Sequence, residues 1–180
     1  MIETRIHGRG GQGSVTLAEL LAVAAFNSGK FAQAFPNFGV ERRGAPVEAY
    51  VRFDDKFIRL RSQVYSPDYV IIQDPTLLTN ENLLANLKPG AVVLLNSKDD
   101  ASGLRLPPGV KVRTIYATEL ALKIIGKPII NTILLGAFAG LTKLIKMSAI
   151  ERAIKERFEG EVAEKNILAA KKGFEVINSI

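Results

Sequence analysis

The chain has 180 residues, of which 47% are hydrophobic and 23% are charged, and its formal net charge is +6. These proportions are those of a globular protein, and they exclude a disordered chain, which would hold fewer apolar residues and a more one-sided charge. The sequence has no cysteine and one histidine, so disulfides and thiolate-ligated iron–sulfur clusters are excluded and a zinc site is not expected. The length predicts one domain, spanning residues 1–180.

The first half of the chain predicts strands around one buried helix. Its elements are a strand at residues 2–7, a glycine-rich turn at 8–13, a helix at 14–26, an irregular loop at 35–46, a strand at 47–53 and an antiparallel hairpin partner at 57–61. The helix carries Glu19 as its only charge, which is typical of a helix buried on most sides. In the strand at 47–53, alternate residues are apolar, so we expect Glu48, Tyr50 and Arg52 to point away from the core.

The second half alternates strands with helices. Its elements are a strand at residues 69–72, a helix at 76–87, strands at 91–95 and 110–115, a helix at 117–125, a helix at 130–146, a helix capped by Ser148 with Glu151 at its third position, and a last helix from Glu161. The continuous apolar runs at 69–72 and 91–95 indicate central strands covered on both faces. The fold class predicted is therefore α/β, a Rossmann-like three-layer α/β/α arrangement with a mixed sheet that is parallel in the middle.

Two features of the predicted helices leave their partner open. An apolar stripe runs along the last helix through Ala163, Ala170 and Ile177, and it packs either on the chain's own core or on another chain. Gly136 and Gly140 lie one turn apart and allow close approach of another backbone, again from this chain or from a partner.

Membrane and nucleic-acid partners are not expected. The longest apolar stretch, residues 129–139, is broken by Asn131 and Thr132 and is shorter than the roughly 20 residues of a membrane span. No secretory signal precedes the first predicted strand, so we expect a cytoplasmic protein. The positive charge favours an anionic partner, but the basic residues are not interleaved with aromatic ones as in a nucleic-acid-binding surface.

The glycine-rich turn, Gly8-Arg9-Gly10-Gly11-Gln12-Gly13, fits the dinucleotide fingerprint in spacing and in its place between a strand and a helix. Glycines let the backbone turn sharply, and a helix N-terminus offers N–H groups and partial positive charge to a phosphate. Arg9 adds a cation. The acid that would bind a ribose hydroxyl about twenty residues later is missing, which disfavours NAD. Two interpretations stay open: an anion site, or a tight turn that packs the helix on the sheet.

The second candidate motif is Glu41-Arg42-Arg43-Gly44, inside the irregular loop. Two adjacent arginines can clamp a carboxylate or phosphate, or can be solvated surface charges. No catalytic residue is assigned: the sequence offers no Ser–His–Asp set, carboxylate pair or metal cluster, and His7 has no partner that can be placed beside it. A chain that works alone would normally show such a set.

Several motifs in order along the chain resemble the gamma subunits of pyruvate and related 2-oxoacid:ferredoxin oxidoreductases. They are the glycine-rich turn, the loop at 36–44, Val51-Arg52, Asp68-Tyr69-Val70 leading to Asp74, Pro89-Gly90, Asn131 ahead of Leu135-Gly136-Ala137, and Asn166. One departure is Ala45, where the family often has a second glycine, and a methyl group is tolerated there unless φ is positive.

The resemblance implies a complex that converts a 2-oxoacid, coenzyme A and oxidised ferredoxin into an acyl-CoA, carbon dioxide and reduced ferredoxin. Thiamine diphosphate and iron–sulfur clusters would be held by partner chains of alpha, beta and delta type, and this chain would help to bind coenzyme A and complete the assembly. The implied cofactor-binding residues are Gly8, Arg9, Gly10, Gly11, Gln12, Gly13, Glu41, Arg42, Arg43 and Gly44. Pyruvate is the default substrate, with branched-chain acids and 2-oxoglutarate left open. The alternatives are a free-standing Rossmann-type nucleotide-binding module and a purely structural subunit.

Overall fold

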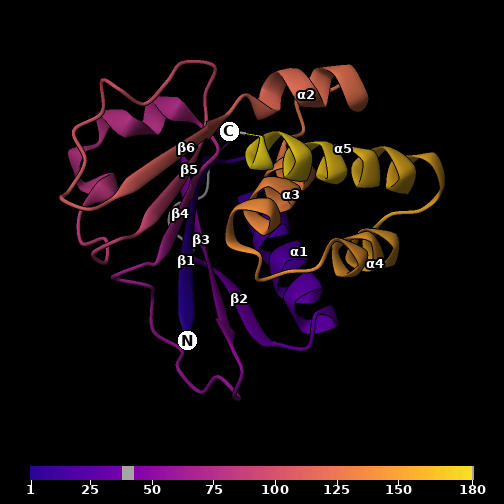
Figure 1. Cartoon of the computed structure of the whole chain (residues 1–180), viewed down its shortest axis with the longest axis horizontal. Coiled ribbons are helices and arrows are strands. Elements are labelled where there is room, and N and C mark those ends of the chain that lie inside the picture. Colours follow the sequence, from indigo (N-terminus) through magenta and orange to yellow (C-terminus); the bar gives the residue numbers. More distant parts are fainter. Residues whose placement is uncertain (38–42, 180) are drawn as a thin grey trace.

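The computed structural model describes residues 1–37 and 43–179, and it contains a six-stranded mixed sheet (Figure 1). The strands are β1 (Ile2–Arg9), β2 (Phe31–Asn37), β3 (Pro46–Asp54), β4 (Tyr69–Ile72), β5 (Val92–Asn96) and β6 (Lys111–Ile115). Their order is β2-β3-β1-β4-β5-β6, in which β1 pairs antiparallel with β3 and parallel with β4. The pairs β4–β5 and β5–β6 are also parallel. The carboxyl ends of β1, β4, β5 and β6 therefore meet at one edge of the sheet.

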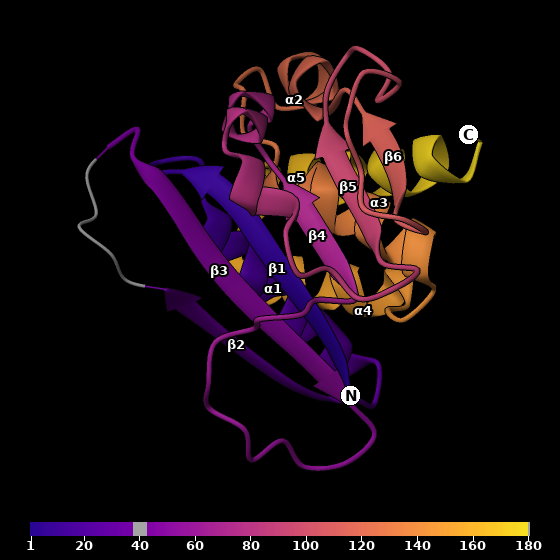
Figure 2. The same ribbon diagram turned by 90° about the vertical axis from the view of Figure 1, so that its left-hand side faces the viewer.

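Helices cover one face of this sheet, as Figures 1 and 2 show for α1 (Ser14–Asn27), α3 (Asn131–Thr142), α4 (Met147–Arg157) and α5 (Gly160–Asn178). The helix α2 (Ala117–Ile124) lies beside α5. Two short 3₁₀ helices, η1 (Pro75–Thr79) and η2 (Glu81–Leu84), pack on the opposite face over β4 and β5. The predicted α/β class, with a sheet that is mixed and parallel in the middle, is confirmed, and the layer on the second face is built from η1, η2 and loops.

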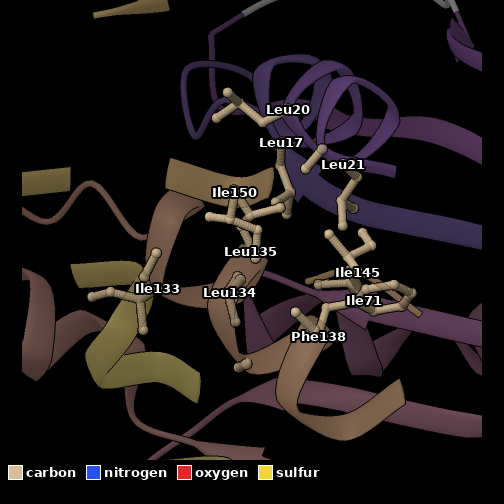
Figure 3. Packing of buried hydrophobic residues seen from close by; sticks show 14 of the residues in the cluster. Leu17, Leu20, Leu21, Ile71, Ile133, Leu134, Leu135, Phe138, Ile145 and Ile150 are labelled. Atoms are coloured by element: carbon tan, nitrogen blue, oxygen red, sulfur yellow. The ribbon is translucent and has the colours of Figure 1, made fainter. Parts of the chain in front are cut away.

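The main core lies between the sheet and the helices. Leu17 and Leu21 from α1, Leu135 and Phe138 from α3 and Ile71 from β4 are all fully buried in one cluster (Figure 3). A smaller cluster on the other face joins apolar side chains of β4 and β5 to η1 and η2. Because α1 and α3 are buried on most sides, their near-continuous apolar sequences carry little amphipathic signal.

The glycines of α3 and the apolar stripe of α5 serve packing within the chain. A Cβ atom at Gly136 would overlap the carbonyl group of Ala170, and one at Gly173 would overlap the carbonyl group of Ile133. The two helices therefore approach closely because these positions lack side chains. Thr132 donates a hydrogen bond to Asn166 across the same contact, with an O···O distance of 2.9 Å.

The predicted hairpin at residues 57–61 is wrong, and so is the irregular reading of residues 35–37. The two antiparallel partners of β3 are β1 and β2, and both precede it in the chain. Pro36 fits there because β2 is an edge strand with one side free of the ladder. Residues 57–61 form no strand; instead the fully buried Arg52 donates hydrogen bonds to the carbonyl oxygens of Ser62 (2.7 Å) and Gln63 (3.2 Å). The segment after β3 is thus held by a side chain.

Three predicted helices also differ. In place of the helix expected at 76–87, the chain forms the two short helices η1 and η2. The side chains of Asp74 and Asn80 each accept a hydrogen bond from the backbone N–H two residues on, so a new short helix begins after each of them. The helix expected at 130–146 ends at Thr142, after which Lys143 takes a left-handed conformation. The predicted cap at Ser148 is wrong, since α4 begins at Met147, one residue earlier.

Candidate functional site

The glycine-rich turn joins the carboxyl end of β1 to the first residue of α1, as its spacing predicts. Gly11 and Gly13 have φ angles of 94° and 76°, which side chains rarely allow. A Cβ atom at Gly8 would collide with the side chains of Ser14 and Gln73, and one at Gly13 would collide with Asn131. The glycines therefore set both the turn and the close approach of α1 to the sheet and to α3.

The N-terminus of α1 is open to a ligand. Its N-cap is Gly13, which has no side chain to accept from the first turn, and that turn holds no acidic residue. The N–H groups of a first helical turn have no partners within the helix, so here they are available to an anion.

Not every N–H group of the turn is available. Gly10 and Gln12 are among the cofactor-binding residues that the resemblance implies, but the Gly10 N–H donates to the Ala45 carbonyl oxygen (2.8 Å) and the Gln12 N–H to the Arg9 carbonyl oxygen (2.9 Å). These two N–H groups stabilise the turn itself, and the part that the two residues play in binding stays a prediction.

The side chain of Arg9 links three loops to one another. Its guanidinium lies 3.2 Å from the carboxylate of Asp74, donates to the hydroxyl of Thr76 (2.7 Å) and donates to the carbonyl oxygen of Gly44 (3.1 Å). The charge of Arg9 is therefore largely offset by Asp74, and Arg9 acts mainly by joining the glycine-rich turn to the loops before β3 and after β4.

Gln12 and Asp74 add further hydrogen bonds to this link. The Gln12 side chain accepts from the Arg9 N–H (2.7 Å) and donates to the Asp74 carboxylate (2.9 Å). Burial alone would raise the pKa of Asp74, but hydrogen bonds from Thr76 and Gln12 and the nearby charge of Arg9 outweigh it and hold the pKa below its ordinary value. Asp74 is therefore a carboxylate at neutral pH, as the arrangement requires.

The two candidate motifs meet at one cavity. The Gly44 N–H donates to the Gly10 carbonyl oxygen (3.0 Å), and Arg43 lies beside Gly11. Arg43 and the glycine-rich turn line a cavity of about 570 Å³ in front of α1, together with Ser14, Val15 and Val47. Glu41 and Arg42 lie outside the described residues. Ala45 is not among the described residues with positive φ, so its methyl group is tolerated.

A buried polar network supports the turn from beneath. Ser14 donates to the side-chain oxygen of Gln73 (2.6 Å), and Gln73 in turn contacts the side chain of Asn131 (3.4 Å). Asn96, at the end of β5, donates to the Gln73 carbonyl oxygen (2.8 Å). Sequence reasoning missed Gln73 and Asn96, although polar residues at the carboxyl ends of neighbouring parallel strands are a usable signal for such a site.

Among residues 1–37 and 43–179, no group of three or more His, Asp or Glu side chains could hold a metal ion. Nor does that part of the chain contain a helix with the length and apolar character that a membrane crossing requires.

Comparisons with known proteins agree on one family. The family described as pyruvate ferredoxin/flavodoxin oxidoreductase matches residues 3–176. Pyruvate synthase subunit PorC of Methanothermobacter thermautotrophicus is 52% identical over 180 residues, covering 100% of this chain and 98% of its own length. The common subunit gamma of the pyruvate/ketoisovalerate oxidoreductases of Thermococcus kodakarensis is 52% identical over 178 residues, with 97% and 96% covered.

Solved structures share the fold. Pyruvate oxidoreductase subunit PORC from Thermotoga maritima superposes with a TM-score of 0.86 at 35% identity, over 97% of this chain and 95% of that one. A 2-oxoglutarate:ferredoxin oxidoreductase from Magnetococcus marinus, solved with 2-oxoglutarate, coenzyme A and succinyl-CoA, matches with a TM-score of 0.83 at 20% identity, over 99% of this chain and 31% of that longer one. The chain therefore belongs to the pyruvate ferredoxin/flavodoxin oxidoreductase family, as a gamma-type subunit of a 2-oxoacid:ferredoxin oxidoreductase.

Proposed function

We propose that this subunit binds the phosphate end of coenzyme A in the cavity at the glycine-rich turn. The observation that carries the proposal is the convergence of Arg43 with an uncapped helix N-terminus on a single cavity of about 570 Å³. Coenzyme A carries a diphosphate and a 3′-phosphate, and both kinds of donor favour phosphate oxygens. The Magnetococcus marinus enzyme, whose structure contains bound coenzyme A, supports a link of this fold to that molecule.

The residues divide the work in this proposal. Gly11, Gly13 and the first turn of α1 supply backbone N–H groups. Arg43 supplies the positive charge, because the charge of Arg9 is already paired with Asp74. Gly8, Gly10, Gln12 and Gly44 hold the turn in shape through the contacts described above. Glu41 and Arg42 remain candidates for binding in the same cavity only because they directly precede Arg43 in the sequence.

The catalytic cofactors belong to other chains in this proposal. A sequence without cysteine cannot ligate an iron–sulfur cluster through thiolates, which fits clusters and thiamine diphosphate on partner chains of alpha, beta and delta type. Ferredoxin would accept the electrons, and pyruvate would be the 2-oxoacid. We propose that residues 1–180 act as one domain within a cytoplasmic complex that has neither a membrane nor a nucleic-acid partner.

The test is Arg43→Ala in the assembled complex, with the Michaelis constant for coenzyme A as the readout. Loss of one charged hydrogen bond to phosphate should raise that KM about tenfold, while kcat at saturating coenzyme A stays the same because the lost contact is present in ground and transition states alike. Arg59→Ala, at an exposed arginine outside the cavity, is the matched control. An unchanged KM in Arg43→Ala would refute the proposal.

A further inference from the structure

A second cavity, of about 420 Å³, lies on the face of β1 and β3 that is turned away from the helices, and η1 and η2 border it. Arg5 and His7 of β1 line this cavity, whereas Ile6 between them is buried in the core under the helices. The cavity shares Arg9 and Val47 with the cavity at the glycine-rich turn. The two cavities therefore adjoin at the carboxyl end of β1, one in front of α1 and the other beside η1 and η2.

Glu48 brings a carboxylate that a ligand can reach to this cavity. Its side chain is 37% exposed, and its carboxylate contacts His7 Nδ1 (3.4 Å) and Asn37 Nδ2 (3.4 Å), two residues that also line the cavity. The Tyr50 hydroxyl donates a further hydrogen bond (2.7 Å). Burial alone would raise the pKa of Glu48, but the hydrogen bond from Tyr50 and the charge of Arg5 help to hold that pKa below its ordinary value. Glu48 is therefore ionised at pH 7, and a carboxylate has about four lone pairs, so it can accept another N–H group from a ligand.

The rest of the lining combines apolar walls with neutral polar groups. The apolar members are Pro46, Val47, Leu77 and Leu83, and the amides are Asn80 and Asn82. Both amide side chains belong to exposed residues. A cavity of this kind suits a flat, uncharged ring that carries hydrogen-bonding groups on its edge. A purine base has that character, since its faces stack on apolar side chains and its edge is bound by side-chain amides.

The charges in this cavity favour an amino group over a phosphate. The negative charge of Glu48 repels a phosphate, and the positive charges of Arg5 and Arg9 are offset by Glu48 and Asp74. The 6-amino group of adenine donates hydrogen bonds, as an ionised carboxylate requires. In coenzyme A, a single ribose separates the base from both phosphate groups, so the base and the phosphates must occupy neighbouring sites. The second cavity therefore has the place and the chemistry of a site for the base.

We infer that this second cavity receives the adenine base of coenzyme A, with the Glu48 carboxylate accepting a hydrogen bond from the 6-amino group. The inference rests on the proposed function, because the phosphates must lie in the adjoining cavity for the base to enter this one. It makes Glu48 a specificity-determining residue, which favours adenine over a purine base without the amino group.

The test compares adenosine 3′-phosphate 5′-diphosphate with its analogue that lacks only the 6-amino group, both as competitive inhibitors against coenzyme A in the assembled complex. Wild type should bind the adenine compound about tenfold more tightly, because a hydrogen bond to a charged group is lost in the analogue. Glu48→Ala should reduce the ratio of the two inhibition constants to about one, and Glu48→Gln, which keeps a neutral acceptor, should give an intermediate ratio.

Two further variants are the controls. Arg43→Ala should weaken both compounds and keep their ratio, because it acts on the phosphates. Glu164→Ala, at an exposed glutamate of α5 outside the cavity, should keep both the affinities and the ratio of wild type. The ratio compares two ligands on one protein, so a general loss of affinity or stability in a variant does not change it.

The outcomes separate the two claims. If Arg43→Ala weakens both compounds while Glu48→Ala keeps the wild-type ratio, the proposed function stands and the inference about the base is overturned. A wild-type ratio near one, with the same effect of Arg43→Ala, also overturns only the inference. If Arg43→Ala weakens neither compound, the phosphate site itself is wrong, and the inference about the base falls with it.

Discussion

The two faces of β1 are filled by different means. On the side of the helices, Ile6 joins an apolar core built from α1, α3 and β4, where packing decides the geometry. On the other side, Arg5 and His7 join Glu48 and the fully buried Arg52 of β3, and hydrogen bonds and ion pairs decide it. Both faces stabilise the fold, the first through apolar packing and the second through the buried contacts of Arg52, and the turn at the end of β1 offers the groups that the proposed ligand needs. The predictions below test this division.

The largest effect is expected from breaking the polar face at Arg52. Its guanidinium lies 2.9 Å from the Glu3 carboxylate and also holds the segment after β3. Arg52→Ala leaves Glu3 and several carbonyl oxygens without their donor, so we expect a loss of about 4 kcal/mol in the free energy of unfolding. Urea denaturation measures it, with the exposed Arg59→Ala expected within about 0.5 kcal/mol of wild type. A loss below about 1 kcal/mol would contradict the role given to Arg52.

A somewhat smaller effect is expected on the apolar face at Gly136. A methyl group there overlaps the Ala170 carbonyl group, so α3 and α5 must move apart, and overpacking of this kind costs about 3 kcal/mol. Gly103→Ala is the matched control, because a Cβ atom at Gly103 would meet no atom within 4 Å. Denaturation of both variants tests whether close helix packing, and not glycine content, stabilises this side.

The smallest effect is expected in how the free energy of unfolding depends on pH, through His7 on the polar face. The folded pKa of His7 is about 4, below its unfolded value of 6.5, so the unfolded chain takes up a proton first as the pH falls. The stabilisation is present above pH 6.5 and is lost as the pH falls towards 4, by about 2 kcal/mol between pH 7 and pH 5. His7→Asn should lack this loss. Equal pH dependence of the two proteins over that interval would show that His7 is not buried in its neutral form.

Much of the fold could be predicted from local pattern, and the errors have physical causes. The apolar runs at β4 and β5 and the fingerprint at β1–α1 carry their own signal. The burial of the polar face of β3 could not be predicted in this way. Glu48, Tyr50 and Arg52 alternate as outward residues should, but the segment after β3 folds back over Arg52 and buries it. Pro36 made β2 hard to predict, because a proline argues against a strand unless the strand lies at the edge of a sheet, as β2 does.

The candidate site was predictable in its parts. The glycine-rich turn and Arg43 could be proposed separately, but only the fold brings them to one cavity. The pairing of Arg9 with Asp74 could not be foreseen, because the two residues are far apart in sequence and meet at the ends of neighbouring strands. That pairing changes the assignment, since it leaves Arg43 as the arginine of the described cavity that is not tied to Asp74.

The most direct test of the account is the KM for coenzyme A in the complex carrying Arg43→Ala, measured against the complex carrying Arg59→Ala. The account predicts a KM about ten times higher for Arg43→Ala, with partial recovery in Arg43→Lys and the same kcat in all three. Equal KM values for the two alanine variants would contradict the claim that the glycine-rich turn and Arg43 form a phosphate site.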